Sequence, residues 1–233
     1  ALVTAIAVLL GVLLAVFSFS VEKPFDDKVL VAQDDSRSSA KSLLALGQRR
    51  SDRELKRNGP VVYLTFDDGP DELITPRISR ILRKKGVVAT FFVVGKNASD
   101  YPDVVRSTSL NGNSIQNHTW WHPKLNGLSD EEVLAEIDST NQIIKRLTGR
   151  KPTCVRPPYD EANSHVKSLI GRRGLDVVRW TIDSNDWKRP GADVLVADVV
   201  AQTRPGSVVL MHDAGGVNRN DTISALGSII DQL

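Results

Sequence analysis

The chain of 233 residues is poor in cysteine and lacks an excess of charge of either sign. Its single cysteine, Cys154, excludes an internal disulfide and a zinc site built from several cysteines. We assign Cys154 no catalytic role, because a lone buried cysteine usually packs as a small apolar side chain. The formal net charge is +2, and outside one basic run the basic residues are scattered. The composition therefore argues against nucleic acid as a partner.

Residues 1–21 form a long apolar segment without any charged side chain. The segment is long enough to cross a bilayer as a helix and exceeds the apolar part of a typical signal peptide. No small-x-small cleavage site follows closely, so we expect a signal-anchor, with a cleaved signal peptide as the alternative. We also expect the natural chain to start upstream of Ala1. The protein would then be exported, either anchored in the membrane with its domain outside the cytoplasm or secreted after cleavage.

Residues 22–58 are polar, with a basic run at 49–57, and are expected to form a tether between the membrane and a folded domain at 59–233. In that domain, apolar runs alternate with helical patterns. The expected strands are 61–64, 87–94, 114–117, 153–155, 176–182 and 207–211. The expected helices are 75–85, 99–110, 129–148, 163–173, 194–202 and 222–233. This alternation predicts a parallel α/β architecture.

Two adjacent carboxylates, Asp67 and Asp68, follow an apolar strand and precede the turn residues Gly69 and Pro70. Because side chains alternate along a strand, the two carboxylates should point in different directions. One of them can then face a metal ion while the other faces a substrate. Taken alone, this motif is equally typical of a plain turn, since Asp, Gly and Pro are all turn residues.

Two histidines, His118 and His122, lie four residues apart after the expected strand at 114–117. If this segment makes a helical turn, both imidazoles can meet one metal ion. With one carboxylate of the Asp pair they would form a three-ligand set with open positions, and imidazole suits zinc, nickel or cobalt. Alone the spacing is a weak signal, because histidine pairs at helical spacing also arise by chance.

Three further clusters follow expected strands, at the face where βα barrels build their active sites. In the first, at 156–159, two prolines lack backbone donors, so the Tyr159 amide is the next one free to hold an oxyanion. The alternative for this cluster is a plain structural loop with Arg156 at the surface. The second, at 183–187, pairs acids with a tryptophan, and alone it is best interpreted as an Asx turn. The third contains His212, a candidate general acid, although a lone histidine is usually structural.

In their order and spacing, these five clusters resemble the motifs of the polysaccharide deacetylases of carbohydrate esterase family 4, the NodB-like domain. The similarity covers about residues 61–212. It implies a distorted (β/α) barrel, preceded here by the N-terminal apolar helix, and metal-dependent removal of acetyl groups from sugars. The cofactor we expect is a divalent metal, with zinc as the first choice and cobalt or nickel as alternatives.

The resemblance also implies a role for each matching residue. The catalytic group comprises Asp67 as the base, Arg156 beside it, His212 as the general acid and Asp186 as the support of that histidine, with Asp183 as a second candidate for the supporting role. The metal ligands are Asp68, His118 and His122. The substrate-binding group comprises the amide of Tyr159 and the acetyl-pocket residues Trp187 and Leu210.

The chain departs from the family pattern at three places. The family usually has glycine where this chain has Asp160, and a carboxylate there would place negative charge near a developing oxyanion. It also usually has glycine where this chain has Gln116. After the last helix the family typically adds one more strand, whereas this sequence ends at Leu233. We expect that the sequence is cut short there, which would leave one barrel edge unpaired.

We therefore expect an N-deacetylase that acts on a polysaccharide containing N-acetylglucosamine, with peptidoglycan as the first choice. Alternatives in the same class are a chitooligosaccharide deacetylase and an acetylxylan esterase. A carbohydrate-binding protein with weak turnover is the alternative of another class. Asp160 favours it, whereas the complete set of acidic and histidine side chains opposes it. The expected partners are an acetylated cell-wall polysaccharide and, through the N-terminal helix, the membrane.

Overall fold

The computed structural model describes residues 61–216 and 218–233 of the chain. The expected apolar helix at 1–21 and the expected tether at 22–58 lie outside these residues. Within the described ranges, no helix is long and apolar enough to cross a bilayer. The anchor, the tether and the boundary at residue 59 stay predictions.

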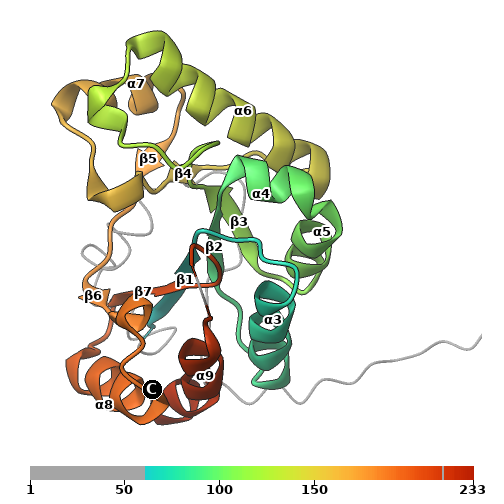
Figure 1. Ribbon diagram of the computed structural model, residues 1–233, viewed down its shortest axis with the longest axis vertical. Helices are drawn as coiled ribbons and strands as arrows, with labels where there is room; N and C mark the ends of the chain where they lie inside the picture. Colours follow the sequence, from blue (N-terminus) through green and yellow to red (C-terminus); the bar gives the residue numbers. More distant parts are fainter. Residues whose placement is uncertain (1–60, 217) are drawn as a thin grey trace, which may run out of the picture.

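Seven parallel strands form one curled sheet in the order β5-β4-β3-β2-β1-β7-β6, with the helices around it (Figure 1). The strands are β1 (Tyr63–Asp67), β2 (Thr90–Val93), β3 (Ser114–Asn117), β4 (Cys154–Val155), β5 (Asp176–Val177), β6 (Ile182–Asp183) and β7 (Val208–His212). In the register of β1 and β7, Asp67 of β1 lies opposite His212 of β7. The prediction of a distorted (β/α) barrel is confirmed.

The helices are α3 (Ile74–Lys84), α4 (Gly95–Asp100), α5 (Pro102–Leu110), α6 (Asp130–Thr148), α7 (Ser164–Arg172), α8 (Ala192–Gln202) and α9 (Asn220–Gln232). Three short 3-10 turns are η1 (Leu125–Gly127), η2 (Pro158–Asp160) and η3 (Asp186–Lys188). The start of α6 is fixed by a capping box between Ser129 and Glu132, and the left-handed Gly149 ends it. Sequence signals predict both ends of this helix.

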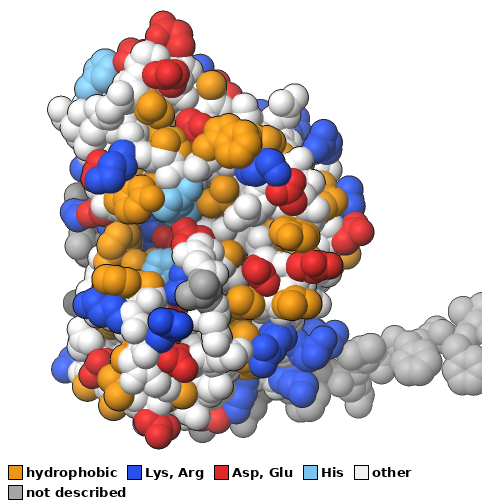
Figure 2. Space-filling model, in the orientation of Figure 1, with side chains coloured by type: hydrophobic (Ala, Val, Ile, Leu, Met, Phe, Trp, Pro, Cys, Tyr) orange, Lys and Arg blue, Asp and Glu red, His pale blue; other side chains and the backbone are white. Residues whose placement is uncertain are grey.

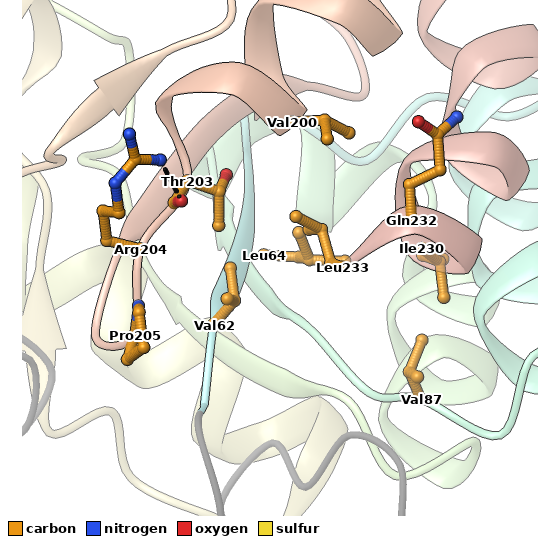
Figure 3. Close-up of a pocket in the computed structure, with 10 residues that line it drawn as sticks. All are labelled: Val62, Leu64, Val87, Val200, Thr203, Arg204, Pro205, Ile230, Gln232 and Leu233. Atoms are coloured by element: carbon orange, nitrogen blue, oxygen red, sulfur yellow. Dashed lines mark hydrogen bonds between the residues drawn. The ribbon is translucent and has the colours of Figure 1, made fainter.

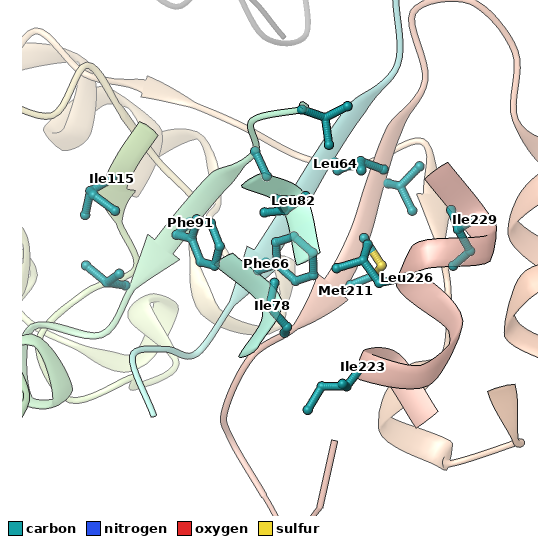
Figure 4. Packing of buried hydrophobic residues seen from close by; sticks show 14 of the residues in the cluster. Leu64, Phe66, Ile78, Leu82, Phe91, Ile115, Met211, Ile223, Leu226 and Ile229 are labelled. Carbon is teal, nitrogen blue, oxygen red and sulfur yellow. The ribbon is translucent and has the colours of Figure 1, made fainter. Parts of the chain in front are cut away.

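The main hydrophobic core lies between the sheet and helices that include α3, α6, α8 and α9, and Figure 4 shows part of it. Phe66 of β1 stacks on Phe91 of β2, with ring centroids 5.1 Å apart. Apolar side chains at helical spacing, such as Ile78 and Leu82 on α3, are fully buried against this layer. The core thereby fixes β1, which carries Asp67 at its carboxyl end and is followed directly by Asp68.

The single strand predicted at 176–182 is wrong, because the structure divides it into β5 and β6 at opposite edges of the sheet. The carbonyls of Val178 and Arg179 accept hydrogen bonds from the Arg156 side chain, at 3.4 and 3.3 Å. Two residues later the chain has reached β7, where the Thr181 amide donates to the Val208 carbonyl at 2.9 Å. A buried arginine thus occupies the place where the apolar pattern predicts a continuous strand.

A cavity of about 290 Å³ lies at the amino ends of β1, β2 and β7, beside α8 and α9 (Figure 3). Its lining is mostly apolar and includes Val62, Leu64, Val87, Ile230 and Leu233. The polar clusters identified in the sequence follow the carboxyl ends of the strands, at the other end of the barrel. The cavity and the candidate site therefore lie at opposite ends of the domain.

Candidate active site and metal centre

The two adjacent carboxylates have different partners. Asp67 is the last residue of β1 and is buried, and its Oδ1 accepts a hydrogen bond of 2.6 Å from Nη1 of Arg156. The next residue, Asp68, takes a left-handed backbone conformation with φ 76°, which turns its side chain towards His118 and His122. The change of direction that alternation predicts is therefore present, helped by a backbone turn at Asp68.

Asp68, His118 and His122 form a compact set of metal-type ligands. Oδ1 of Asp68 lies 3.4 Å from Nε2 of His118 and 3.2 Å from Nε2 of His122, and the three ligand atoms lie within 4.8 Å of one another. Burial alone would raise the pKa of the Asp68 carboxyl, but hydrogen bonds from His118 and His122, and positive charge on His118 and His212, hold it well below its ordinary value. The carboxylate is therefore ionised, as a metal ligand must be.

The second histidine reaches this set without the helical turn that the spacing of the two histidines allows. The segment between the two histidines is irregular, and both Thr119 (φ 67°) and His122 (φ 61°) have left-handed backbone. The Thr119 amide donates to Oδ1 of Asn117 at 2.7 Å, and the His122 amide donates to Oγ1 of Thr119 at 3.1 Å. Side-chain hydrogen bonds therefore shape this loop in place of a helical ladder.

The contacts of His118 favour a bound metal ion. Its Nδ1 lies 2.6 Å from the carbonyl of Arg156, which can only accept, so Nδ1 carries the proton. Nε2 faces the carboxylates of Asp67 and Asp68 at 3.8 and 3.4 Å, and it is the ring nitrogen that offers a lone pair to an ion when the imidazole is neutral. A fixed tautomer of this kind is typical of metal-binding histidines. The donor set of two imidazoles and one carboxylate therefore fits a divalent transition metal.

Arg156 lies fully buried at the end of β4, with 0% of its surface exposed. Its guanidinium donates to Asp67 and to Oγ1 of Thr65, the latter at 2.9 Å, and lies 4.2 Å from the ring centroid of Phe92. A buried arginine needs such partners, because an unpaired charge in the interior is strongly unfavourable. The paired arginine therefore holds Asp67 in one orientation.

On β7, the strand paired with β1, His212 forms a second hydrogen-bonded unit with Asp186 of η3. Nδ1 of His212 donates to Oδ1 of Asp186 at 2.6 Å, while the His212 amide and Oγ1 of Thr222 donate to Oδ2 at 2.9 and 2.7 Å. Burial would lower the pKa of His212, but Asp186 first, and then the charges of Asp67 and Asp68, raise it above its ordinary value. Nε2 of a protonated His212 can therefore donate a proton.

The other acid of this segment has a local structural role. Oδ1 of Asp183 accepts a hydrogen bond of 2.8 Å from the Asn185 amide, which is an Asx turn. This contact corresponds to the structural interpretation of the cluster, whereas Asp186 contacts the histidine. Burial would raise the pKa of Asp186, but hydrogen bonds from His212 and Thr222 lower it below its ordinary value.

The three residues expected to bind substrate differ in exposure. Tyr159 and Trp187 are 60% and 53% exposed, whereas Leu210 is buried in β7, two residues before His212. The Tyr159 ring packs edge-on against His122, with centroids 4.8 Å apart. Figure 2 shows histidine side chains near the middle of this face, beside carboxylates and apolar side chains. Aromatic surface therefore borders the candidate metal site, and aromatic side chains commonly line ligand-binding sites.

Several supporting residues carry no motif that sequence reasoning could detect. Oε2 of Glu136 in α6 accepts hydrogen bonds from the amides of Trp120 and Trp121, at 2.7 and 2.8 Å, and so fixes the loop between the histidines. In the sequence, Glu136 is one more acid on an amphipathic helix. Its role depends on the packing of α6 against β3, which adjacent positions in the chain do not reveal.

A second supporting contact comes from the loop after β7. The carboxylate of Asp213 lies where a side chain at Gly69 would be, 2.3 to 2.6 Å from the Cβ position, and accepts a hydrogen bond of 2.6 Å from Oγ1 of Thr75. Burial raises the pKa of Asp213 to about 7. A Cβ atom at Gly215 would lie 1.7 Å from Oδ2 of Asp68. The glycines at 69 and 215 therefore allow the two loops to pack closely behind the metal ligand.

Comparison with known proteins identifies the family. The family model described as polysaccharide deacetylase matches residues 54–178. The chain belongs to the polysaccharide deacetylase family. A peptidoglycan-N-acetylglucosamine deacetylase of Bacillus cereus is 38% identical over 176 residues, which cover 76% of this chain and 64% of the relative. The chain therefore spans slightly less than two thirds of that relative.

Two further polysaccharide deacetylases show the range of relatives. A chitooligosaccharide deacetylase of Azorhizobium caulinodans is 36% identical over 160 residues, covering 68% of this chain and 76% of the relative. The crystal structure of a peptidoglycan N-acetylglucosamine deacetylase in complex with a substituted benzamide superposes with a TM-score of 0.72. That structure is 37% identical, and the match covers 73% of this chain and 80% of the solved chain. The predicted family and fold are thereby confirmed.

Proposed function

We propose that this chain is a metal-dependent hydrolase that removes N-acetyl groups from a polysaccharide containing N-acetylglucosamine, with peptidoglycan as its substrate. The observation that carries the proposal is the arrangement of Asp67 and His212 on paired strands beside the ligand set of Asp68, His118 and His122. This arrangement brings together groups that would serve as a proton acceptor, a proton donor and the ligands of a metal ion. Relatives named for action on peptidoglycan support the choice of polymer.

Each of the chain's own groups has a role in hydrolysis of the acetamide. A divalent ion held by Asp68, His118 and His122 would polarise the acetyl carbonyl and lower the pKa of water. Asp67, oriented by Arg156, accepts a proton from the water whose oxygen adds to the acetyl carbon. We expect the Tyr159 amide to donate to the resulting oxyanion.

The second proton transfer completes the reaction. When the carbon–nitrogen bond breaks, the sugar nitrogen takes a proton from Nε2 of His212 and leaves as an amine, and acetate is the other product. Asp186 keeps His212 in the required tautomer, because Nδ1 of the histidine donates to it at 2.6 Å. We propose zinc as the ion, with cobalt or nickel as alternatives, since imidazole and carboxylate suit all three.

Location and anchoring complete the proposal. The apolar segment at 1–21 has the composition of a membrane anchor, and the polar segment at 22–58 has that of a tether. We propose that the domain acts outside the cytoplasm, on polymer close to the membrane. Secretion after cleavage of a signal peptide is the alternative.

The test measures acetate released by the full chain, purified in mild detergent and supplied with zinc or cobalt. Peptidoglycan, chitooligosaccharides and acetylxylan are compared at equal acetyl content. We expect the fastest release from peptidoglycan. A preference for chitooligosaccharides, as relatives of that name suggest, would change the polymer but keep the chemistry. Release from acetylxylan alone would contradict N-deacetylation, and binding without any release would favour the carbohydrate-binding alternative.

A further inference from the structure

The loop that carries the expected oxyanion donor has an unusual backbone. Tyr159 and Asp160 in η2 both have left-handed conformations, with φ 59° at each residue. Residues that carry a side chain rarely adopt this backbone conformation, and glycine is the residue that accepts it most readily. Asp160 occupies a position where the family usually has glycine. Some other contact must therefore hold the backbone of this loop in place.

That contact is an ion pair between Asp160 and Arg179. Nε of Arg179 donates to Oδ1 of Asp160 at 2.7 Å, and Nη2 of the same guanidinium contacts Oδ2, so the pair is bidentate. This geometry fixes direction as well as charge, because the planar fork of arginine matches a carboxylate. The carboxylate of Asp160 is therefore neutralised by a partner within the domain.

Arg179 also contacts the part of the site that holds the expected base. Its backbone carbonyl accepts a hydrogen bond of 3.3 Å from Nη2 of Arg156, whose Nη1 donates to Asp67. Through its side chain Arg179 therefore holds the loop of Tyr159, and through its backbone it contacts the arginine beside Asp67. One residue connects the two halves of the proposed reaction centre.

We propose that Arg179 is a positioning residue, which acts through Asp160 to hold the Tyr159 amide towards the reacting carbonyl. It also cancels a negative charge that would otherwise oppose the oxyanion. This inference rests on the proposed function, because the amide needs an exact position only if an oxyanion forms there. In the family, the usual glycine accepts the left-handed backbone at this position, whereas here the ion pair holds Asp160 in that conformation.

The kinetic test compares four variants of the metal-loaded full chain: Arg179→Ala, Asp160→Gly, the double variant, and Arg173→Ala. The last is a matched control, because Arg173, directly after α7, also forms an arginine–aspartate ion pair, in which its Nε donates to both oxygens of Asp138 in α6 at 3.0 Å. Exposed ion pairs contribute little to global stability, so all four variants should fold.

We expect Arg179→Ala to lower kcat about tenfold with little change in KM, since misplacing a group that acts in the transition state affects the chemical step. The double variant, in which Asp160→Gly is added to Arg179→Ala, should have a kcat within about twofold of the parent. The added glycine removes the uncompensated charge and accepts the left-handed backbone. Arg173→Ala should leave kcat unchanged. An Arg179→Ala variant as active as the control would overturn the proposal, as would a double variant as slow as Arg179→Ala.

A second readout does not depend on turnover. NMR relaxation of the amides of Tyr159 and Asp160 should give order parameters near 0.85, typical of rigid backbone, in the parent, and values below about 0.6 in Arg179→Ala. Unchanged order parameters in that variant would refute the positioning role. If the parent releases no acetate from any substrate, the proposed function fails, and this measurement still decides whether Arg179 holds the loop.

Discussion

At the scale of single residues, the adjacent carboxylates make the sharpest distinction. Asp68→Asn replaces an anionic ligand with a neutral amide beside His118 and His122, so metal affinity should fall strongly. Asp67→Asn leaves the three ligands intact and still offers an oxygen to Arg156, so metal should stay bound. Acetate release by Asp67→Asn should nevertheless fall about 10²–10⁴-fold, the usual contribution of a positioned base.

Bound metal per chain and initial rate, measured for both variants under identical conditions, check this pair of expectations. Metal lost from Asp67→Asn and retained by Asp68→Asn would exchange the two roles. If both variants kept full activity, the motif would be a turn and nothing more.

The pH profile tests the pairing of His212 with Asp186. Burial opposes the charged imidazole, but Asp186, Asp67 and Asp68 together raise its pKa. A general acid must be protonated, so a raised pKa extends activity to higher pH. Asp186→Asn removes the largest favourable charge, so the pKa of His212 should fall and the alkaline limb of kcat/KM should move to lower pH.

Asp183→Asn is the matched control for this profile, because Asp183 lies on the same segment and its carboxylate bonds to the Asn185 amide. The profile of this variant should coincide with that of the parent. If the profile shifted in Asp183→Asn and not in Asp186→Asn, the acid that supports His212 would be Asp183. His212→Ala with unchanged kcat would remove the histidine from the acid role altogether.

At the scale of elements, regular structure follows from the sequence better than the loops that shape the site. Local sequence determines both ends of α6, through the capping box of Ser129 and the glycine after the helix, and it also determines the strand β3. The loop from His118 to His122 is different, because Glu136 of a later helix fixes it. Spacing alone allows a helical turn there, whereas the structure has an irregular loop that still brings the two histidines together.

The same limit explains the division between β5 and β6. An apolar run such as 176–182 predicts one strand, since its own residues favour one. The decisive partner is Arg156, which lies some twenty residues earlier and takes up two of its carbonyls. The identities of the site residues could be predicted because the motifs are ordered along the chain, whereas their supports depend on tertiary contacts.

Gly215 tests the packing of the two loops behind the metal ligand. Its backbone is left-handed, with φ 73°, and an added Cβ would meet Oδ2 of Asp68 at 1.7 Å. Gly215→Ala should therefore displace the carboxylate and lower metal affinity about 10–100-fold, as loss of a ligand's support does. Gly174→Ala is the control, because its backbone is also left-handed but nothing lies within 4 Å of its Cβ position. Isothermal titration with zinc measures both variants, and equal affinities would show that Asp68 is not held by this contact.

At the scale of the whole molecule, metal and stability should be linked. An ion that binds only the folded chain, at a free concentration of 100 times its Kd, stabilises the fold by about 2.7 kcal/mol. For a domain of this size that corresponds to a rise in Tm of about 5–10 °C. Chelator should reverse this rise and abolish acetate release, and added divalent metal should restore both.

Calorimetry and the acetate assay on the same sample check this linkage. Asp68→Asn serves as the control, since its Tm should respond little to metal. Acetate release that persists in metal-free protein would refute the proposed mechanism.

The polarity of the sheet also determines how the enzyme can be handled as a reagent. Val61 lies two residues before β1, and Leu233 lines the cavity at the amino ends of the strands, so both ends of the described domain lie opposite the candidate site (Figure 1). A bead, a surface or a fusion partner coupled at either end of the described domain would therefore lie on the side away from the candidate site. An immobilised form should still reach insoluble glycan sheets and could be recovered from them by simple sedimentation.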